Sequence, residues 1–197
     1  MVLNKIIALP GLFMAIIFHE VAHGYTAYKL GDPTAKNAGR LTLNPIKHID
    51  LTGFLFLLIF KFGWAKPVPV NSMYFKHRKR DMILVSLAGP LTNFLLALVL
   101  GGILSIGFIT NEIVAQILII GIWYNIMLGI FNLLPFPPLD GSKVVASLLP
   151  TKYEYFFYEN QRYLSLILII LILTNSVDKI LSPLIDFTLN IMMKIFA

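Results

Sequence analysis

The pattern His-Glu-x-x-His occurs at His19, Glu20 and His23, inside a stretch of mostly apolar residues. Four residues advance an α-helix by about 400°, so on a helix the two imidazoles lie on one face, about 40° apart. Two imidazoles in that arrangement can bind one Zn²⁺ ion. Glu20 stands beside them, placed to take a proton from a metal-bound water. The pattern therefore predicts a metal centre that activates water.

The surroundings of this motif favour a functional interpretation. An ionisable group inside a membrane span is energetically costly and by default marks a functional site. The chain contains no cysteine, so His, Asp and Glu must supply any metal ligands. The alternative is that the three residues line an aqueous vestibule or pair with one another for structural reasons.

Two histidines do not complete a catalytic zinc site, which usually has three protein ligands and a water. The candidates for the third ligand are His48, His77, Asp50, Asp81, Asp140, Asp178 and Asp186. Asp140 is the strongest, because three prolines between positions 135 and 138 prevent a regular helix just before it. Irregular backbone at membrane depth lines a cavity or packs within protein, so Asp140 could reach the first helix. By spacing alone, a helix N-cap explains Asp140 equally well.

The composition predicts the environment in which this chemistry takes place. Of 197 residues, 57% are hydrophobic and 13% are charged, and the mean hydropathy is +0.79. The charged share is about half that of a typical soluble domain, which excludes an ordinary cytosolic globule. The net charge of +6 does not indicate a nucleic-acid partner, because the basic residues form no soluble patch. We therefore expect an all-α polytopic membrane protein.

Three apolar stretches, 6–28, 82–109 and 113–139, are long enough to cross about 30 Å of hydrocarbon. Residues 163–177 and 180–193 form two short spans or a hairpin that dips into the bilayer. Residues 51–60 are too few to span and indicate a buried or re-entrant piece. The prediction is about four to six transmembrane helices in a single domain, 1–197, with a catalytic core over about 6–145 and C-terminal apolar helices within 163–193.

The basic residues predict the orientation of these spans. Residues 31–81 contain nine Lys and Arg, whereas the turn near 111–112 contains none. The positive-inside rule places 31–81 in the cytoplasm, so the first span runs inward and a polar channel opens on the cytoplasmic side. The basic cluster at 76–80 is most simply a topology signal beside anionic lipid.

Several motifs in the same order resemble the site-2 protease family, the intramembrane zinc metalloproteases. They are His19–Gly24, Gly39–Pro45 followed by His48–Asp50, Gly63–Val70, Ala88–Asn93 and Asn132–Gly141. Together they cover about 15–145, and the last 50 residues match only as apolar helix. Nothing in the chain is long enough for the accessory domains that the family often carries. The chain therefore resembles a minimal catalytic core.

The resemblance implies a role for each matching residue. His19, His23 and Asp140 would bind one Zn²⁺ per chain, and Glu20 would be the general base. Asn93 and Asn132 match polar positions near the catalytic centre of the family, where they would support the substrate or the transition state. Interhelical hydrogen bonds are the alternative for both asparagines. His48 fits an ordinary interfacial histidine better than a catalytic one.

The family places a membrane-associated β-hairpin around 63–70. Prolines at 67 and 69 alternate with valines, which suits an edge strand. A helical substrate must become extended before cleavage, and an edge strand can replace its lost backbone partners by β-augmentation. The predicted substrate-presenting strand is Trp64, Ala65, Lys66, Pro67 and Val68.

The implied activity is hydrolysis of a peptide bond in or near a transmembrane segment of another protein, as in regulated intramembrane proteolysis. The implied setting is the lipid bilayer of a prokaryotic cell membrane, with a regulatory membrane protein as a further partner. A non-catalytic or transport-type zinc-binding membrane protein is the alternative. Transport does not require Glu20 between the histidines, and the internal repeat typical of transporters is not visible.

Overall fold

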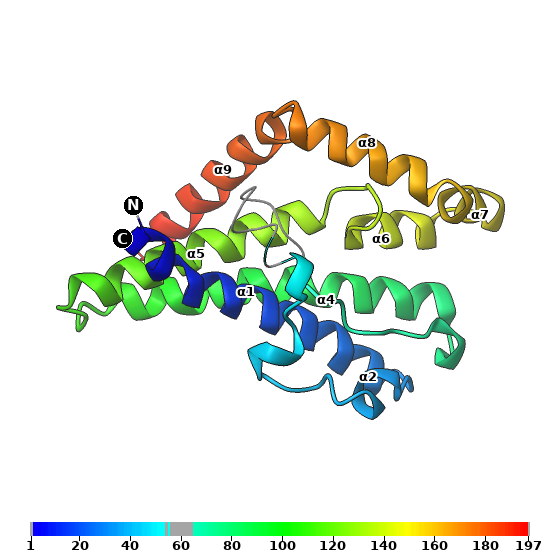
Figure 1. The fold of residues 1–197 in the computed structure, drawn as a ribbon, viewed down its shortest axis with the longest axis horizontal. Helices are drawn as coiled ribbons and strands as arrows, with labels where there is room; N and C mark the ends of the chain where they lie inside the picture. Colours follow the sequence, from blue (N-terminus) through cyan, green and yellow to red (C-terminus); the bar gives the residue numbers. More distant parts are fainter. Residues whose placement is uncertain (1, 54, 56–64, 197) are drawn as a thin grey trace.

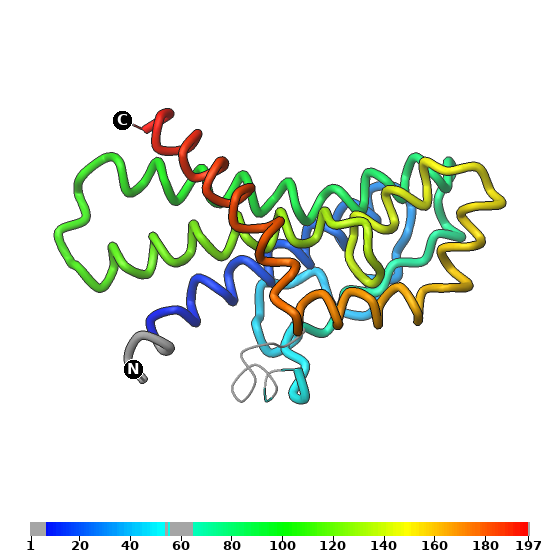
Figure 2. Tube along the Cα trace, turned by 90° about the horizontal axis from the view of Figure 1, so that it is seen from above, coloured from blue at the N-terminus to red at the C-terminus, as the bar shows by residue number. Residues whose placement is uncertain are grey.

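Three long helices form the centre of the fold: α1 (Val2–Lys29), α4 (Arg78–Ser105) and α5 (Glu112–Asn132). The computed structural model describes residues 2–53, 55 and 65–196. Each of the three helices packs against the other two, and Figures 1 and 2 show them running side by side. The described part contains helices and no sheet, which confirms the predicted all-α class.

Shorter and peripheral helices surround this centre. They are α2 (Thr34–Asn37), α6 (Asp140–Leu148), α7 (Thr151–Glu159), α8 (Gln161–Leu173) and α9 (Asp178–Phe196), with 3₁₀ turns η1 (Pro45–Lys47) and η2 (Ser72–Tyr74). α6 packs against α4, and α9 packs against α4 and α5. Figure 1 shows α8 and α9 meeting at an angle on the α5 side of the molecule.

Three helices in the described part are long and apolar enough to cross a membrane: Ile7–Lys29, Arg78–Ser105 and Glu112–Asn132. α7 and α8 add a fourth if this pair, bent by 64°, is counted as one span. The structure thus supports a polytopic membrane protein, and its described helices reach only the lower end of the predicted four to six spans. The predicted stretch 113–139 is shorter as a helix, because α5 ends at Asn132, before the prolines.

Two glycines set the distance between α1 and α5. A Cβ atom added to Gly11 of α1 would lie 2.8 Å from the Cα of Gly121 on α5, closer than real Cβ atoms approach. Only hydrogen fits between the two backbones. Small residues at helix crossings are the usual way for membrane helices to pack closely. This contact brings the motif-bearing helix α1 against α5.

The buried core lies between α4, α5 and α9, and includes Ala97, Leu100, Ile122, Ile126 and Ile185. Large apolar side chains also remain exposed on the outer faces of the same helices. Examples are Leu91, Leu95 and Val99 on α4, Ile119 on α5, and Phe187 on α9. In water such a surface would be unfavourable, whereas lipid tails solvate it.

The segment from Ala65 to Val70 is extended and lies against the 40–49 loop. Ile49 and Ala65 form an antiparallel bridge, and the Lys66 N–H donates to the His48 carbonyl at 2.9 Å. The Arg40 guanidinium donates to the Lys66 carbonyl at 2.6 Å. Within the described residues the β pairing consists of this isolated bridge, and it does not form the predicted two-stranded hairpin. Trp64 and most of the predicted re-entrant stretch 51–60 lie outside the described residues.

Candidate metal centre

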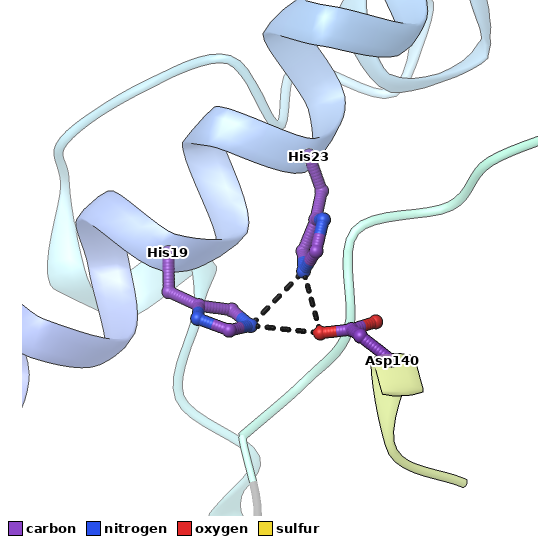
Figure 3. Close-up of side chains that lie close together, drawn as sticks. All are labelled: His19, His23 and Asp140. Carbon is purple, nitrogen blue, oxygen red and sulfur yellow. Dashed lines mark hydrogen bonds and ion pairs between the residues drawn. The ribbon is translucent and has the colours of Figure 1, made fainter. Parts of the chain in front are cut away.

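His19 and His23 of α1 meet Asp140, the first residue of α6, in the interior of the bundle (Figure 3). Asp140 Oδ2 lies 3.1 Å from His19 Nε2 and 2.9 Å from His23 Nε2. The two Nε2 atoms are 2.9 Å apart. All three side chains are buried. Within the described residues this is the group of three His, Asp or Glu side chains close enough to share a metal ion.

The opposite ring nitrogens determine which atoms face this meeting point. His23 Nδ1 donates to the Val85 carbonyl at 2.7 Å, and His19 Nδ1 donates to Asn93 Oδ1 at 2.5 Å. A neutral imidazole carries one ring hydrogen, so both Nε2 atoms present lone pairs. Two ring nitrogens and a carboxylate oxygen therefore converge as acceptors, which requires a cation or a proton among them. Two nitrogens and one oxygen are also a ligand set that suits Zn²⁺.

Gly89 of α4 leaves the space beside these nitrogens open. A Cβ atom added to Gly89 would lie 2.5 Å from His23 Nε2 and 2.6 Å from His19 Nε2. Because Gly89 has no side chain, the space next to the two Nε2 atoms stays free. This space and the donor set together fit a bound metal ion.

The turn before α6 aims Asp140 at the histidines. A Cβ atom on Gly141 would lie 2.2 Å from the Leu133 carbonyl oxygen, so the chain reverses there only with glycine. The N-cap position of α6 is occupied by Leu139, and Asp140 is the first helical residue, so the alternative N-cap interpretation of Asp140 is wrong. Lys143, one turn later, donates to Asp140 Oδ1 at 3.0 Å and leaves Oδ2 for the histidines.

A cavity of about 810 Å³ opens onto this centre. Its lining includes His19, Glu20, His23, Asn132, Asp140 and Val68. Glu20 Oε2 accepts a hydrogen bond from the Val68 N–H at 2.6 Å. The Glu20 carboxylate is therefore hydrogen-bonded to the extended segment 65–70, and both line the same cavity.

Comparison of the sequence with known proteins shows the family of this chain. The family model for peptidase family M50 matches residues 100–174. A curated relative from Bacillus subtilis (strain 168), named "Putative zinc metalloprotease YwhC", is 37% identical over 196 residues, covering 94% of this chain and 89% of the relative. The chain belongs to peptidase family M50. As the motifs predicted, it is a zinc metallopeptidase of the site-2 protease type, an intramembrane enzyme.

Archaeal relatives of this M50 peptidase come from Methanocaldococcus jannaschii. "Putative zinc metalloprotease MJ0611" is 34% identical over 146 residues, covering 73% of this chain and 71% of the relative. "Zinc metalloprotease MJ0392" is 30% identical over 144 residues, covering 73% of this chain and 34% of the relative. No solved structure matches the chain. Bacterial and archaeal relatives fit the predicted prokaryotic membrane, and their names imply zinc.

The two asparagines predicted near the centre of this M50 peptidase differ in position. Asn132 lines the cavity and donates to the Leu128 carbonyl at 3.0 Å. Asn93 is fully buried and is not part of the cavity wall; it binds His19, the Ala15 carbonyl and Asn125 instead. Of the two asparagines, Asn132 is therefore the one that faces the cavity.

The other ligand candidates lie apart from the candidate metal centre. His48, predicted to be interfacial, is buried; its Nε2 donates to the Thr42 carbonyl at 2.7 Å. Asp81 accepts from the His77 backbone N–H at 2.9 Å at the start of α4. Asp50, Asp178 and Asp186 also lie outside the cluster.

Sequence analysis missed Asn125, Lys143 and Gly89 as neighbours of the centre. An amide inside the apolar helix α5 is a signal that could have drawn attention to Asn125. The three-residue spacing from Asp140 places Lys143 on the same helix face. Gly89 belongs to the motif Ala88–Asn93, but its place beside the histidines depends on the approach of α4 to α1.

Proposed function

We propose that His19, His23 and Asp140 hold one Zn²⁺ per chain and that Glu20 is the general base. The substrate is a membrane protein cleaved in or near a transmembrane segment. The observation that carries this proposal is the convergence of three acceptor atoms beside Gly89, on the cavity that Glu20 also lines. A transporter would need no such carboxylate at that place.

When bound, Zn²⁺ would lower the pKa of water toward about 7 and polarise the scissile carbonyl. Glu20 takes a proton from the attacking water and passes it to the leaving amine. The Val68 N–H supports this role because it holds the carboxylate on the cavity wall. Asn132, which lines the same cavity, supports the substrate or the transition state, and Asn93 acts indirectly through its hydrogen bond with His19.

The substrate-presenting strand of the proposal remains residues 64–68 in a membrane-associated hairpin. The N–H groups of Lys66 and Val68 already bind His48 and Glu20, and Pro67 has no N–H. The Lys66 carbonyl already accepts from Arg40, so the carbonyls of the other residues are the groups that this edge would offer to an extended substrate. Pairing at the Val68 N–H would compete with Glu20.

We further propose a single domain over 1–197, with its core over about 6–145, four to six spans and access from the cytoplasm. His23 lies six residues before the end of α1 at Lys29, about 9 Å along the helix. The basic residues Arg78, Lys79 and Arg80 begin α4, whereas the α4–α5 turn has none. The proposal also includes a regulatory membrane protein as a partner that would control cleavage.

The deciding experiment is metal content measured by mass spectrometry on the purified full-length chain. We expect about one zinc per wild-type chain and little or none in Asp140→Ala. The control is Asp186→Ala, which removes an exposed aspartate of α9 outside the cluster. Zinc retained in Asp140→Ala would move the third ligand elsewhere, and no zinc in folded wild type would contradict the proposal.

The contact between Val68 and Glu20 makes a separate prediction. Val68→Pro removes the N–H that holds the carboxylate, and a hydrogen bond to a charged group contributes about 1.5–3 kcal/mol. We expect kcat/KM for a tagged single-span reporter to fall about 10–100-fold, with zinc content unchanged. Val68→Ala keeps the N–H and serves as the control. Equal activity of the two variants would show that the contact does not support catalysis.

A further inference from the structure

Asn125 lies in the middle of α5 and is completely buried among apolar side chains. It belongs to none of the motifs that define the metal centre. A buried amide is costly in an apolar span unless its polar atoms have partners. Its partners therefore indicate what it does.

A continuous chain of hydrogen bonds joins Asn125 to the metal centre. Asn125 Nδ2 donates to the Gly121 carbonyl at 2.8 Å, and Asn125 Oδ1 accepts from Asn93 Nδ2 at 2.9 Å. Asn93 Nδ2 also donates to the Ala15 carbonyl at 3.0 Å. Asn93 Oδ1 then accepts from His19 Nδ1 at 2.5 Å. The chain crosses from α5 through α4 to α1.

Two backbone carbonyls determine which atom donates and which accepts in each of these hydrogen bonds. The carbonyls of Gly121 and Ala15 can only accept, so each requires an NH₂ group from its asparagine. Asn125 must therefore turn its oxygen toward Asn93, and Asn93 must turn its oxygen toward His19. The hydrogen of His19 is placed on Nδ1 as a result, and Nε2 keeps its lone pair for the metal.

The two histidines differ in how much support they need. The acceptor for His23 Nδ1 is the Val85 backbone carbonyl, which cannot reverse. The acceptor for His19 Nδ1 is an amide, which can rotate and present NH₂ instead of oxygen. A reversed Asn93 would favour the His19 tautomer with hydrogen on Nε2, and that tautomer cannot bind a metal through Nε2.

We infer that Asn125 is a positioning residue that, together with the Ala15 carbonyl, holds the Asn93 amide in one orientation and thereby keeps His19 in its metal-binding tautomer. This inference rests on the proposed metal centre. Outer partners of metal-binding histidines typically change metal affinity about 10–100-fold when they are removed. Asn125 acts one residue further out, so the lower end of that range applies.

The test compares zinc dissociation constants of full-length variants, measured by competition with a chromophoric chelator after metal depletion. Asn125→Leu removes both hydrogen bonds, and we expect binding about 10-fold weaker than wild type. Asn125→Asp, as the neutral acid that burial in an apolar span favours, can accept from Asn93 and donate its O–H to the Gly121 carbonyl, and we expect affinity within about threefold of wild type. Absorption spectra of the Co²⁺-loaded proteins report the ligand geometry independently of activity, and should change in Asn125→Leu only.

Ile126→Ala is the matched control, because Ile126 is the next residue on α5 and is also fully buried, but takes no part in the chain of hydrogen bonds. It should lower the melting temperature and leave zinc affinity and the Co²⁺ spectrum unchanged. Wild-type affinity in Asn125→Leu, no rescue by Asn125→Asp, or an equal loss in Ile126→Ala would overturn the inference. Failure of the wild type to bind zinc would instead overturn the metal centre and the inference with it.

Discussion

The Glu20→Gln variant is expected to bind zinc like the wild-type chain and to cleave a tagged single-span membrane reporter at less than about 1% of its rate. A general base contributes about 10²–10⁴-fold, and glutamine cannot take a proton from water. Zinc should remain, because Glu20 is outside the group of three facing side chains. The measurements are metal content by mass spectrometry and reporter cleavage in reconstituted vesicles.

Glu112→Gln is the matched control for this substitution. Glu112 is exposed at the start of α5, far along the chain from the cavity lining. It should cleave the reporter like wild type. Cleavage above about 1% in Glu20→Gln would exclude the general-base role. Loss of zinc together with activity would instead assign Glu20 to the metal site.

The Gly89→Ala variant is expected to lose zinc although glycine offers no ligand atom. The added Cβ would lie within 2.6 Å of both Nε2 atoms, so either the rings or α4 must move. Loss of a hydrogen-bond partner of a metal-binding histidine lowers metal affinity about 10–100-fold. A clash at the ligand atoms themselves should therefore weaken zinc binding by more than about 100-fold. Chelator competition on the purified chain measures this effect.

The same helix offers a control for the added methyl group. A Cβ on Gly102 would meet its nearest neighbour, Phe196 Cε1, at an ordinary van der Waals distance of 3.6 Å. Gly102→Ala should therefore bind zinc like wild type and remain folded. If Gly89→Ala bound zinc equally well, α4 could not lie as close to the histidines as it does here.

The strongest sequence predictions concerned local patterns. The four-residue spacing of His19 and His23 needs only one turn of helix to bring both rings to one face. The long apolar runs predicted α1, α4 and α5, because crossing hydrocarbon demands about 20 helical residues. The family followed from several motifs in a shared order, and the YwhC similarity over most of the chain confirms it.

The weaker predictions concerned residues whose roles depend on distant partners. Asn93 and Asn132 are both asparagines in apolar spans, yet only Asn132 lines the cavity. His48 is buried by its contacts within the loop, and its local sequence does not predict this packing. The number of spans is ambiguous because α7 and α8 meet at a 64° bend that periodicity does not predict.

The sequence by itself predicted the ligand types, the general-base position and the membrane environment, because these depend on residue identity and spacing within one helix. The tertiary structure decided that Asp140 reaches His19 across 121 positions and that Asn93 reaches it across 74. Those contacts depend on the approach of helix backbones at Gly11, Gly121 and Gly89. Glycines do not contribute to the hydrophobic periodicity of a helix, so only the packed structure shows where they allow two helices to approach closely.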